Sequence, residues 1–395
     1  MIGALQTLLL IVESVLALFV GYLLLLTGAA WLAPRRTPSR DRAPDHRFLI
    51  LIPAHNEERL LPSLLEKVQR LDYPSSLYTV HVVADNCTDR TAELARVGGA
   101  VVHERTDAVN VGKGYALEWL IHRLWEREEP HDAMLILDSD SIVSENFLTV
   151  MDARLARGEK AIQGYYAVRD PAGSWSASLR SVALAAVHYL RPQARTVLGG
   201  SVGLKGNGMV FAADVIKRYR WPASLTEDIE YHMALILDDQ RVTFAPDALV
   251  WAEMPGTLAA SQTQNVRWER GRQEMVRYYV PRLLRAALAK RSFLLFDSAV
   301  EQIIPPFSIL AAASVLCLLA ALALQSGAGV ALGILLVTGQ AIYTFAALLL
   351  ARVPIRVYQA LLLAPVFVVW KVWLYLRVSL GLERKGWIRT ARNDP

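Results

Sequence analysis

The chain has few cysteines and comparatively few charges for its 395 residues. Two cysteines cannot form a disulfide framework, and Cys317 lies within an apolar run, so we expect reduced thiols. Charged residues make up 20% and hydrophobic residues 53%, which excludes disorder, collagen and coiled coil and is too apolar for a wholly soluble protein. The net charge of +5 could indicate nucleic-acid binding, but the basic residues lie beside apolar segments, as in membrane proteins. We therefore expect no nucleic-acid partner.

The first apolar segment, residues 1–34, is long enough to cross a bilayer. It carries one charge, Glu13, and the stretch from Leu5 to Ala33 could span a hydrocarbon core of roughly 30 Å. No basic residue precedes it, which argues against a cleaved signal peptide. Arginines follow at positions 35, 36, 40 and 42, so the positive-inside rule places the segment after them in the cytosol. We expect a plasma-membrane protein with a cytoplasmic catalytic domain at 35–280.

Two more spans are expected between residues 302 and 351, where no charge occurs. The sequence QSGAG at 325–329 is a natural turn between them. Gly329 and Gly333 form a GxxxG pattern, by which two copies of the chain could pair into a homo-oligomer.

Two flanking segments suit the membrane surface. Residues 281–301 have the pattern of an amphipathic interfacial helix, with a helix of the soluble domain as the alternative. In the segment 352–395, Lys371 and Arg377 lie among aromatic residues, as is typical of the headgroup boundary. We expect an interfacial helix and a basic cytoplasmic tail there, with a fourth span as the alternative.

The middle of the chain alternates between strand-like and helical patterns. Apolar runs of strand length occur at 48–54, 79–85, 100–105 and 133–140. This alternation predicts an α/β domain with a mostly parallel sheet that helices cover on both faces. No GxGxxG follows the first strand and no GxxxxGK[ST] occurs, so a dehydrogenase and a P-loop NTPase lose their main support.

Polar residues gather where three of these strands end, at 55–58, 85–89 and 138–140. Ligands of open α/β sheets bind outside the carboxyl ends of the strands, so we expect one crevice there. Asp138 and Asp140 offer hard oxygen ligands for Mg²⁺ or Mn²⁺ held by a diphosphate, although such a pair also suits a plain turn. Lys113, between two glycines, could approach a phosphate, or could be a solvated loop lysine.

Seven motifs occur in order between Phe48 and Arg272: LIPAHNEE, VVADNCTD, GKGYALEWL, LDSDS, LKGNGMVF, LTEDIE and QNVRWERGR. Their order and spacing resemble membrane-integrated family-2 glycosyltransferases, the group of the cellulose, hyaluronan and chitin-oligosaccharide synthases. The resemblance implies a GT-A fold, a nucleotide-sugar donor, a divalent metal and inversion at the anomeric carbon. The expected fold is thus an α/β GT-A domain with a mostly parallel mixed sheet, flanked by transmembrane and interfacial helices.

The resemblance also implies roles for individual residues. Asp228 matches the catalytic base, Asp85 a ligand of the nucleobase, Asp138 a residue near ribose and metal, and Asp140 the direct metal ligand. Donor-binding positions would further include Ala54, His55, Glu57, Lys113, Gln264 and Arg267, the last facing the leaving diphosphate. Acceptor-binding positions would be Gly206, Asn207, Glu227 and Trp268, whose indole offers an apolar face to a sugar.

Two departures concern the first Asp motif, which reads ADN, and the acceptor motif, which reads GNG at 206–208. His232, one helical turn from Asp228, is expected to have a packing role. The predicted function is inverting transfer of a sugar, with UDP as the expected carrier, to a lipid-linked or membrane-associated glycan acceptor. Three spans are too few for a single chain to enclose a polysaccharide channel, so we expect transfer of single sugars. A processive synthase and a catalytically silent nucleotide-sugar-binding subunit are the alternatives.

Overall fold

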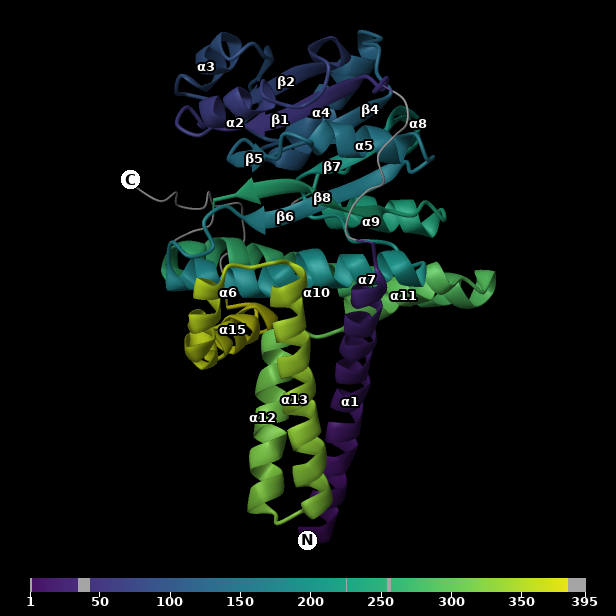
Figure 1. Cartoon of the computed structure of the whole chain (residues 1–395), viewed down its shortest axis with the longest axis vertical. Helices are drawn as coiled ribbons and strands as arrows, with labels where there is room; N and C mark the ends of the chain where they lie inside the picture. Colours follow the sequence, from purple (N-terminus) through teal and green to yellow (C-terminus); the bar gives the residue numbers. More distant parts are fainter. Residues whose placement is uncertain (1, 35–42, 225, 254–256, 383–395) are drawn as a thin grey trace.

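The computed structural model describes residues 2–34, 43–224, 226–253 and 257–382. Figure 1 shows a layered α/β domain above a bundle of long helices. The bundle consists of α1 (Ile2–Leu32), α12 (Phe307–Ala323) and α13 (Gly327–Leu350). Between the two parts lie α10 (Leu258–Lys290) and α11 (Phe293–Ile303), which run across the top of the bundle.

The domain is built on one mixed sheet of eight strands, in the order β3-β2-β1-β4-β7-β6-β8-β5. The strands are β1 (Phe48–Ala54), β2 (Tyr78–Asp85), β3 (Val101–Arg105), β4 (Ala133–Ile136), β5 (Ser141–Val143), β6 (Ala161–Val168), β7 (Met209–Ala212) and β8 (Thr243–Ala252). Strands β1 to β4 pair in parallel, as does β6 with β8, whereas β7 and β5 pair antiparallel with their neighbours. The α/β class and the mixed sheet are confirmed.

Helices cover both faces of the sheet, which explains the continuous apolar strands. Every residue of β1 is buried. Leu49 and Leu51 contribute to one hydrophobic cluster, and Ile50 and Ile52 to the other, because successive side chains of a strand point to opposite faces. The helices of the domain are α2 (Leu61–Val68), η1 (Ser75–Leu77), α3 (Thr91–Val97), α4 (Lys113–Glu126), α5 (Phe147–Leu155), α6 (Trp175–Leu184), η2 (Ala185–Leu190), α7 (Arg191–Leu198), α8 (Ala213–Arg218) and α9 (Glu227–Leu237).

Three helical segments of the described chain are long and apolar enough to cross a membrane: α1, α13 and residues 355–379. The last comprises α14 (Ile355–Tyr358), η3 (Gln359–Leu363) and α15 (Ala364–Ser379). The 17 residues of α12 qualify only together with α11, at a bend of 64°. This set differs from the expected one. We expected two spans within 302–351, in addition to the first span, and an interfacial helix after them.

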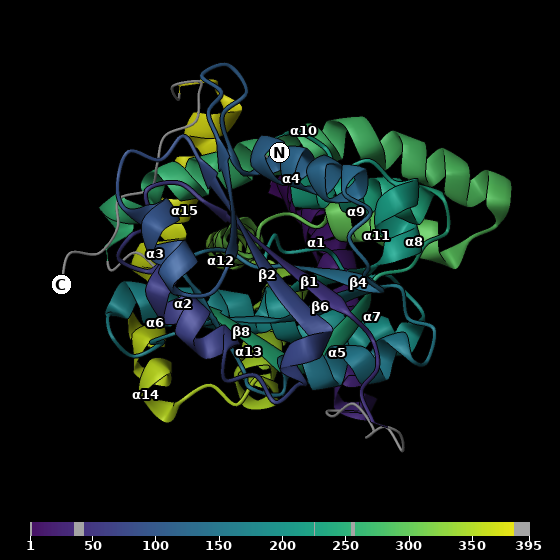
Figure 2. The same ribbon diagram turned by 90° about the horizontal axis from the view of Figure 1, so that it is seen from above.

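The segment ending in α15 nevertheless lies differently from the bundle. Figures 1 and 2 together show α15 running across the axis of α12 and α13, next to α10, rather than alongside them. Lys371 Nζ donates a hydrogen bond to Asn265 Oδ1 of α10 (2.7 Å), and Gln273 Nε2 donates to Ser379 Oγ (3.0 Å). This placement agrees with an interfacial helix, although length and composition alone also allow a span.

Two expected features of the membrane region need correction. Residues 281–301 do not form one helix, because Arg291 adopts a positive φ of 51° and Ser292 caps the start of α11, accepting a hydrogen bond from the Leu295 amide. The GxxxG glycines of α13 do not form a free face for a second copy. Gly333 lies against Leu318 of α12, and Gly329 lies against Ala321, so their close approach serves packing within one chain.

A buried ionic cluster joins the bundle to the domain. Asp297 of α11, 3% exposed, accepts hydrogen bonds from Arg195 Nε and Nη2 of α7 and from the Tyr22 hydroxyl of α1 (2.8 Å). Nearby, Arg191 Nε donates to the Tyr343 hydroxyl of α13 (2.8 Å), and its Nη1 lies 3.3 Å from Glu301 Oε1. Helices α1 and α13 are thus fixed to the domain by largely buried polar contacts.

Candidate active site

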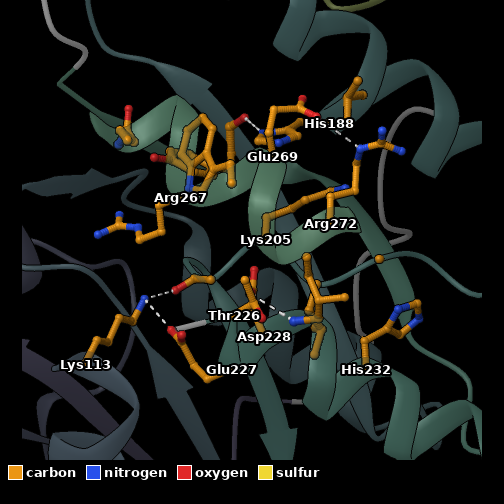
Figure 3. Close-up of a pocket in the computed structure, with 18 of the residues that line it drawn as sticks. Lys113, His188, Lys205, Thr226, Glu227, Asp228, His232, Arg267, Glu269 and Arg272 are labelled. Atoms are coloured by element: carbon orange, nitrogen blue, oxygen red, sulfur yellow. Dashed lines mark hydrogen bonds and ion pairs between the residues drawn. The ribbon is translucent and has the colours of Figure 1, made fainter. Parts of the chain in front are cut away.

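A cavity of about 710 Å³ lies between the sheet, α9 and α10, and it reaches down to the turn between α11 and α12. Figure 3 shows the side chains that surround it. The predicted site residues that line it are His55, Glu57, Lys113, Asp138, Asp140, Gly206, Glu227, Asp228, Gln264, Arg267 and Trp268. The strand ends at 55–58 and 138–140 therefore open onto one crevice, as expected.

Lys113 organises the acidic side of this cavity. Its ammonium donates hydrogen bonds to Asp138 Oδ1 (2.6 Å) and to the carbonyl of Gly206, and it lies 3.8 Å from Glu227 Oε1. Burial opposes its charge, but the carboxylates of Asp138, Glu227 and Asp228 outweigh this effect and raise the pKa of Lys113. The residue is thus a cation held among carboxylates and not a solvated loop lysine.

Asp228 and Glu227 fill the first turn of α9. Thr226 precedes the helix, but its hydroxyl makes no capping hydrogen bond. Burial raises the pKa of both carboxyls above the usual range of such groups. The positive φ of Gly206 (76°) lets the chain pass close beneath, where a Cβ would lie 3.4 Å from Asp228 Oδ2. An acid with a raised pKa in a cavity is suited to accept a proton near neutral pH.

Asp138 and Asp140 lie in the turn between β4 and β5. Asn207 fixes this turn: its Oδ1 accepts a hydrogen bond from the Asp138 amide (3.1 Å), and its Nδ2 donates to Ser141 Oγ (2.7 Å). Asn207 is fully buried and does not line the cavity, so it supports the turn from behind, and its contact with the acceptor stays a prediction. The two carboxylates supply hard oxygen ligands of the kind that Mg²⁺ and Mn²⁺ prefer.

Asp85 and Ala54 lie behind the cavity and do not line it. Asp85 is 4% exposed, and its Oδ1 accepts hydrogen bonds from Arg105 Nη1 (2.6 Å) and Asn86 Nδ2 (3.2 Å). The carbonyl of Asp85 lies 2.7 Å from His55 Nδ1, which orients the imidazole. The third strand end therefore supports the crevice from behind, and a contact of Asp85 or Ala54 with a nucleobase stays a prediction.

The predicted QxxRW residues lie on the first turns of α10. Gln264 Oε1 accepts a hydrogen bond from Arg180 Nη1 (2.6 Å), and the Arg180 guanidinium lies 5.8 Å from the centre of the Trp268 ring. Trp268 is 39% exposed, so its indole is open to a ligand. Among the described residues, none forms a hydrogen bond or ion pair with Arg267. In Figure 3 its side chain extends on the same side as Lys113, as a cation available to an anionic group.

His232 has the expected packing role. Its Nε2 lies 3.0 Å from Ser201 Oγ, and burial, with the positive charges of Arg195 and Lys205, lowers the pKa of His232 to about 3. The neutral imidazole thus supports α9, and it also forms part of the cavity wall.

Sequence reasoning missed several residues that line the cavity, among them Arg191, Lys205, Glu269, Arg272, Glu301 and Lys371. Lys205, Glu269 and Arg272 lie within the motifs LKGNGMVF and QNVRWERGR, where they could have been found. Arg191, Glu301 and Lys371 come from segments that only the tertiary fold brings to the cavity. For Lys371 the aromatic neighbours indicated a membrane surface, and no spacing connected this residue with the catalytic motifs. Burial lowers the pKa of Lys205 to about 8.

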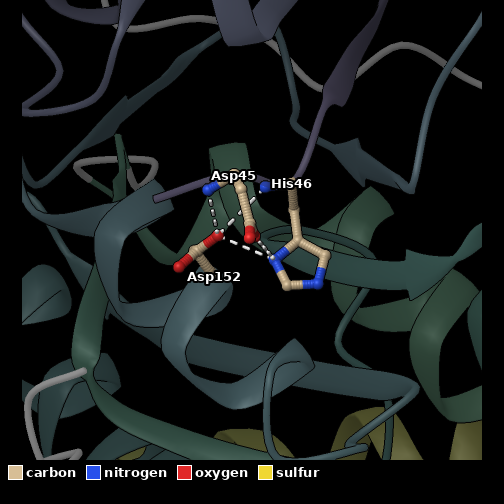
Figure 4. Close-up of side chains that lie close together, drawn as sticks. All are labelled: Asp45, His46 and Asp152. Atoms are coloured by element: carbon tan, nitrogen blue, oxygen red, sulfur yellow. Dashed lines mark hydrogen bonds and ion pairs between the residues drawn. The ribbon is translucent and has the colours of Figure 1, made fainter. Parts of the chain in front are cut away.

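A second polar group lies outside the cavity, where the chain enters β1 (Figure 4). The ligand atoms of Asp45, His46 and Asp152 all lie within 4.8 Å of one another, close enough to hold a metal ion. Asp152 Oδ1 already accepts hydrogen bonds from the His46 amide (3.2 Å) and the Tyr73 hydroxyl (3.1 Å), and lies 2.7 Å from His46 Nδ1. These bonds attach the start of β1 to α5.

Comparison with known proteins identifies the domain. Residues 44–271 match the family model described as glycosyltransferase like family 2. The chain belongs to this family. The family is one of glycosyltransferases.

Curated relatives of this family-2 glycosyltransferase are named as a glycosyltransferase and as a polysaccharide synthase. The probable glycosyltransferase YdaM of Bacillus subtilis (strain 168) is 24% identical over 260 residues, which cover 63% of this chain and 60% of the relative. The poly-β-1,6-N-acetyl-D-glucosamine synthase of Staphylococcus aureus (strain COL) is 26% identical over 236 residues, or 57% of this chain and 54% of the relative. The chain thus matches less than two thirds of the length of either protein.

A solved structure agrees with the fold of this family-2 glycosyltransferase. The mannosyltransferase PcManGT from Pyrobaculum calidifontis, in complex with GDP-Man and Mn²⁺, superposes with a TM-score of 0.52 and 19% sequence identity. The match covers 88% of this chain and 98% of that one. The expected GT-A architecture is confirmed.

Proposed function

We propose that this glycosyltransferase transfers a sugar, with inversion, from a nucleotide-sugar donor to a hydroxyl group of an acceptor held at the membrane. The observation that carries the proposal is the position of Asp228. Its buried carboxyl, with a raised pKa, lines the same cavity as the Asp138–Asp140 turn and the cationic Arg267. A proton acceptor and groups suited to a diphosphate thus line one space.

In the proposed reaction the acceptor hydroxyl attacks the anomeric carbon from the side opposite the diphosphate. The new carbon–oxygen bond forms as the bond to the diphosphate oxygen breaks, and the nucleoside diphosphate leaves with that electron pair. Asp228 takes the hydroxyl proton. Arg267 and Lys113 offset the negative charge that develops on the leaving group, and Trp268 offers its indole face to the acceptor. Glu227, beside Asp228, is proposed to contact the acceptor.

A divalent cation fits the donor set at the Asp138–Asp140 turn, where two carboxylates open onto the cavity. When bound, Mg²⁺ or Mn²⁺ would stabilise charge on the diphosphate. The Mn²⁺ and GDP-Man complex of PcManGT supports both the metal and the donor class, and we propose a UDP-sugar as the donor here.

We further propose an enzyme integral to the plasma membrane, with its catalytic domain in the cytoplasm, that adds single sugars to a lipid-linked or membrane-associated glycan. The bundle of three helices, with α15 lying across it, supports transfer of single sugars. A processive synthase is the second candidate, because the S. aureus relative is named for a polymer of N-acetylglucosamine. Product length at low turnover distinguishes the two, since a processive enzyme makes long chains early.

The decisive experiment measures nucleotide release by the detergent-purified protein with a panel of nucleotide sugars. We expect one donor to be consumed in a metal-dependent reaction that an added acceptor accelerates. Tight binding of a nucleotide sugar without release under any condition would instead indicate a catalytically silent subunit.

A further inference from the structure

The membrane-side end of the cavity contains polar groups that the proposed reaction does not use. They come from the loop before β7, from α10 and from the end of α11, and all of them line the cavity: Lys205, Glu269, Arg272 and Glu301. We call these four residues the acceptor subsite. Below them lies the turn between α11 and α12, whose residues 304–307 also line the cavity. Figure 3 labels Lys205, Glu269 and Arg272 among the side chains that surround the cavity.

Three atoms of the acceptor subsite are buried and lack a hydrogen bond from the described residues: Glu269 Oε2, Arg272 Nε and Glu301 Oε2. Arg272 Nε and Glu269 Oε2 lie 3.5 Å apart, which is an ion pair at the long end of hydrogen-bonding range. Buried polar atoms of native proteins are nearly always hydrogen-bonded. Three such atoms around one end of a cavity are therefore available to hydrogen-bond a ligand that fills it.

The chemistry of these atoms selects among ligands. Glu301 lies 3.3 Å from the Arg191 guanidinium, which favours its ionised form, and an ionised carboxylate only accepts hydrogen bonds. A phosphate dianion could pair with the cations at this end, but it has no proton to donate to the Glu269 or Glu301 carboxylate. A hydroxyl group can donate to the Glu269 and Glu301 carboxylates and can accept from Lys205 and Arg272. A ligand with several hydroxyl groups can therefore hydrogen-bond both the carboxylates and the cations at this end of the cavity.

The position of the acceptor subsite also points to the membrane. Arg272 Nη1 donates a long hydrogen bond to the Ile304 carbonyl (3.5 Å) in the α11–α12 turn. Arg191, the partner of Glu301, is hydrogen-bonded to Tyr343 of α13. The subsite thus lies directly on top of the helix bundle, while Asp228 lines the same cavity.

Resting on the proposed function, we infer that the acceptor subsite binds the hydroxyl groups of a sugar or similar polyol head group on a membrane lipid, and that a lipid phosphate is not the acceptor. Lys205 and Arg272 donate to the oxygens of this head group, and Glu269 and Glu301 accept from its hydroxyls. The apolar part of the acceptor leaves the cavity past the α11–α12 turn toward the bilayer.

The test compares two acceptors, dodecyl β-glucoside and dodecyl phosphate, with the full-length enzyme in one detergent and with the donor that the panel identifies. We expect sugar transfer to the glucoside only. Glu269→Gln and Glu301→Gln should each raise the KM for the glucoside about tenfold, because an amide binds hydroxyls less strongly than a carboxylate, with the donor KM unchanged. Glu274→Gln is the matched control, since Glu274 is exposed on α10 and does not line the cavity.

Transfer to dodecyl phosphate in preference to the glucoside would overturn the inference, as would a rise in donor KM equal to that in acceptor KM. Glu301→Gln also removes the charge partner of Arg191, so its thermal unfolding is compared with that of the parent. If that variant unfolds, Glu269→Gln alone decides, because Glu269 has no part in the Arg191 cluster. Failure to release nucleotide from any donor would instead contradict the proposed function and would leave both acceptors unmodified.

Discussion

The side chain of Thr226 lies directly against the backbone of Gly271. A methyl group added to Gly271 would overlap Thr226 Cγ2, so only glycine lets α10 approach the start of α9 so closely. This contact sets the spacing between the helix that carries Asp228 and the helix that carries Arg267 and Trp268. The positions of α9 and α10 in the cavity wall thus depend on the absence of a side chain at Gly271.

Gly271→Ala should therefore reduce sugar transfer at least about tenfold, because α10 must move away from α9. Thr226→Ser removes the overlapping methyl group and keeps the hydroxyl. The double variant should recover most of the lost activity, a non-additive result that marks direct contact. Steady-state kinetics on the four proteins of this cycle provide the measurement, and purely additive losses would show that the contact does not set the spacing.

Asp228→Asn should lower the rate of transfer by roughly 10²–10⁴-fold, since an amide cannot take the proton of the acceptor. Donor binding should change little, because the base acts on the acceptor. If Asp228 only complemented the helix dipole, an effect of about 0.3–1 kcal/mol, stability would fall slightly and transfer would persist. Glu227→Gln is the neighbouring control and should be milder. Transfer by Asp228→Asn within a few-fold of the parent would rule out the role of base.

The pH dependence of transfer should reveal the environment of Asp228. Burial raises the pKa of this carboxyl, while Lys113 lowers it. The base must be ionised, so kcat/KM for the acceptor should fall as the pH drops through this raised pKa. Lys113→Met removes the opposing charge and should move the acid limb upward by about one pH unit. Lys113→Arg should leave the limb near its original position, and an unmoved limb in the methionine variant would contradict the coupling.

Chelation should stop transfer, and added Mg²⁺ or Mn²⁺ should restore it. Asp140→Ala should remain inactive at high metal concentration, because the lost oxygen belongs to the protein. Asp214→Ala serves as control, since that carboxylate pairs with Lys160 on the surface. Full activity of the parent in excess chelator would exclude a metal from the reaction.

Cysteine labelling should establish which helices cross the membrane. In a Cys87→Ser, Cys317→Ser background, Gln325→Cys lies in the α12–α13 turn and should react with an impermeant maleimide on intact cells. Leu382→Cys, after α15, should be protected if α15 lies on the cytoplasmic surface. Labelling at both positions would mean that residues 355–379 form a span.

The sequence predicted the sheet well where strands are buried on both faces. The run at 48–54 became β1 with its bounds unchanged, because seven apolar residues leave no solvent face. The run at 133–140 was too long, since β4 ends at Ile136 and the Asp138 amide bonds to the Asn207 side chain instead of a strand. A hydrogen bond between a backbone amide and a side chain distant in sequence cannot be predicted from the spacing of residues.

The motifs correctly predicted the cavity-lining residues at the edge of the sheet and on α9 and α10. They did not reveal the lining residues that other helices bring to the cavity through tertiary packing. Asp138, Asp228 and Arg267 line one cavity as their motifs indicated. Asn207 points inward to Ser141, which the acceptor motif did not reveal. Glu301 reaches the cavity at the 64° bend between α11 and α12. Pro305 and Pro306 mark this break in the sequence, but they do not reveal which side chains it brings to the cavity.

The Tyr22–Asp297 hydrogen bond means that α1 contributes to the structure of the domain in addition to any role as a membrane anchor. Removing α1 to obtain a soluble enzyme would take away a hydrogen-bond donor to a buried carboxylate, together with the fully buried Leu23 and Leu26, and would uncover the parts of α7 and α13 that pack against α1. The same carboxylate holds Arg195 of α7, in the wall of the cavity. Truncation at the N-terminus would therefore disturb the wall of the cavity. Preparations of this enzyme should keep the first helix.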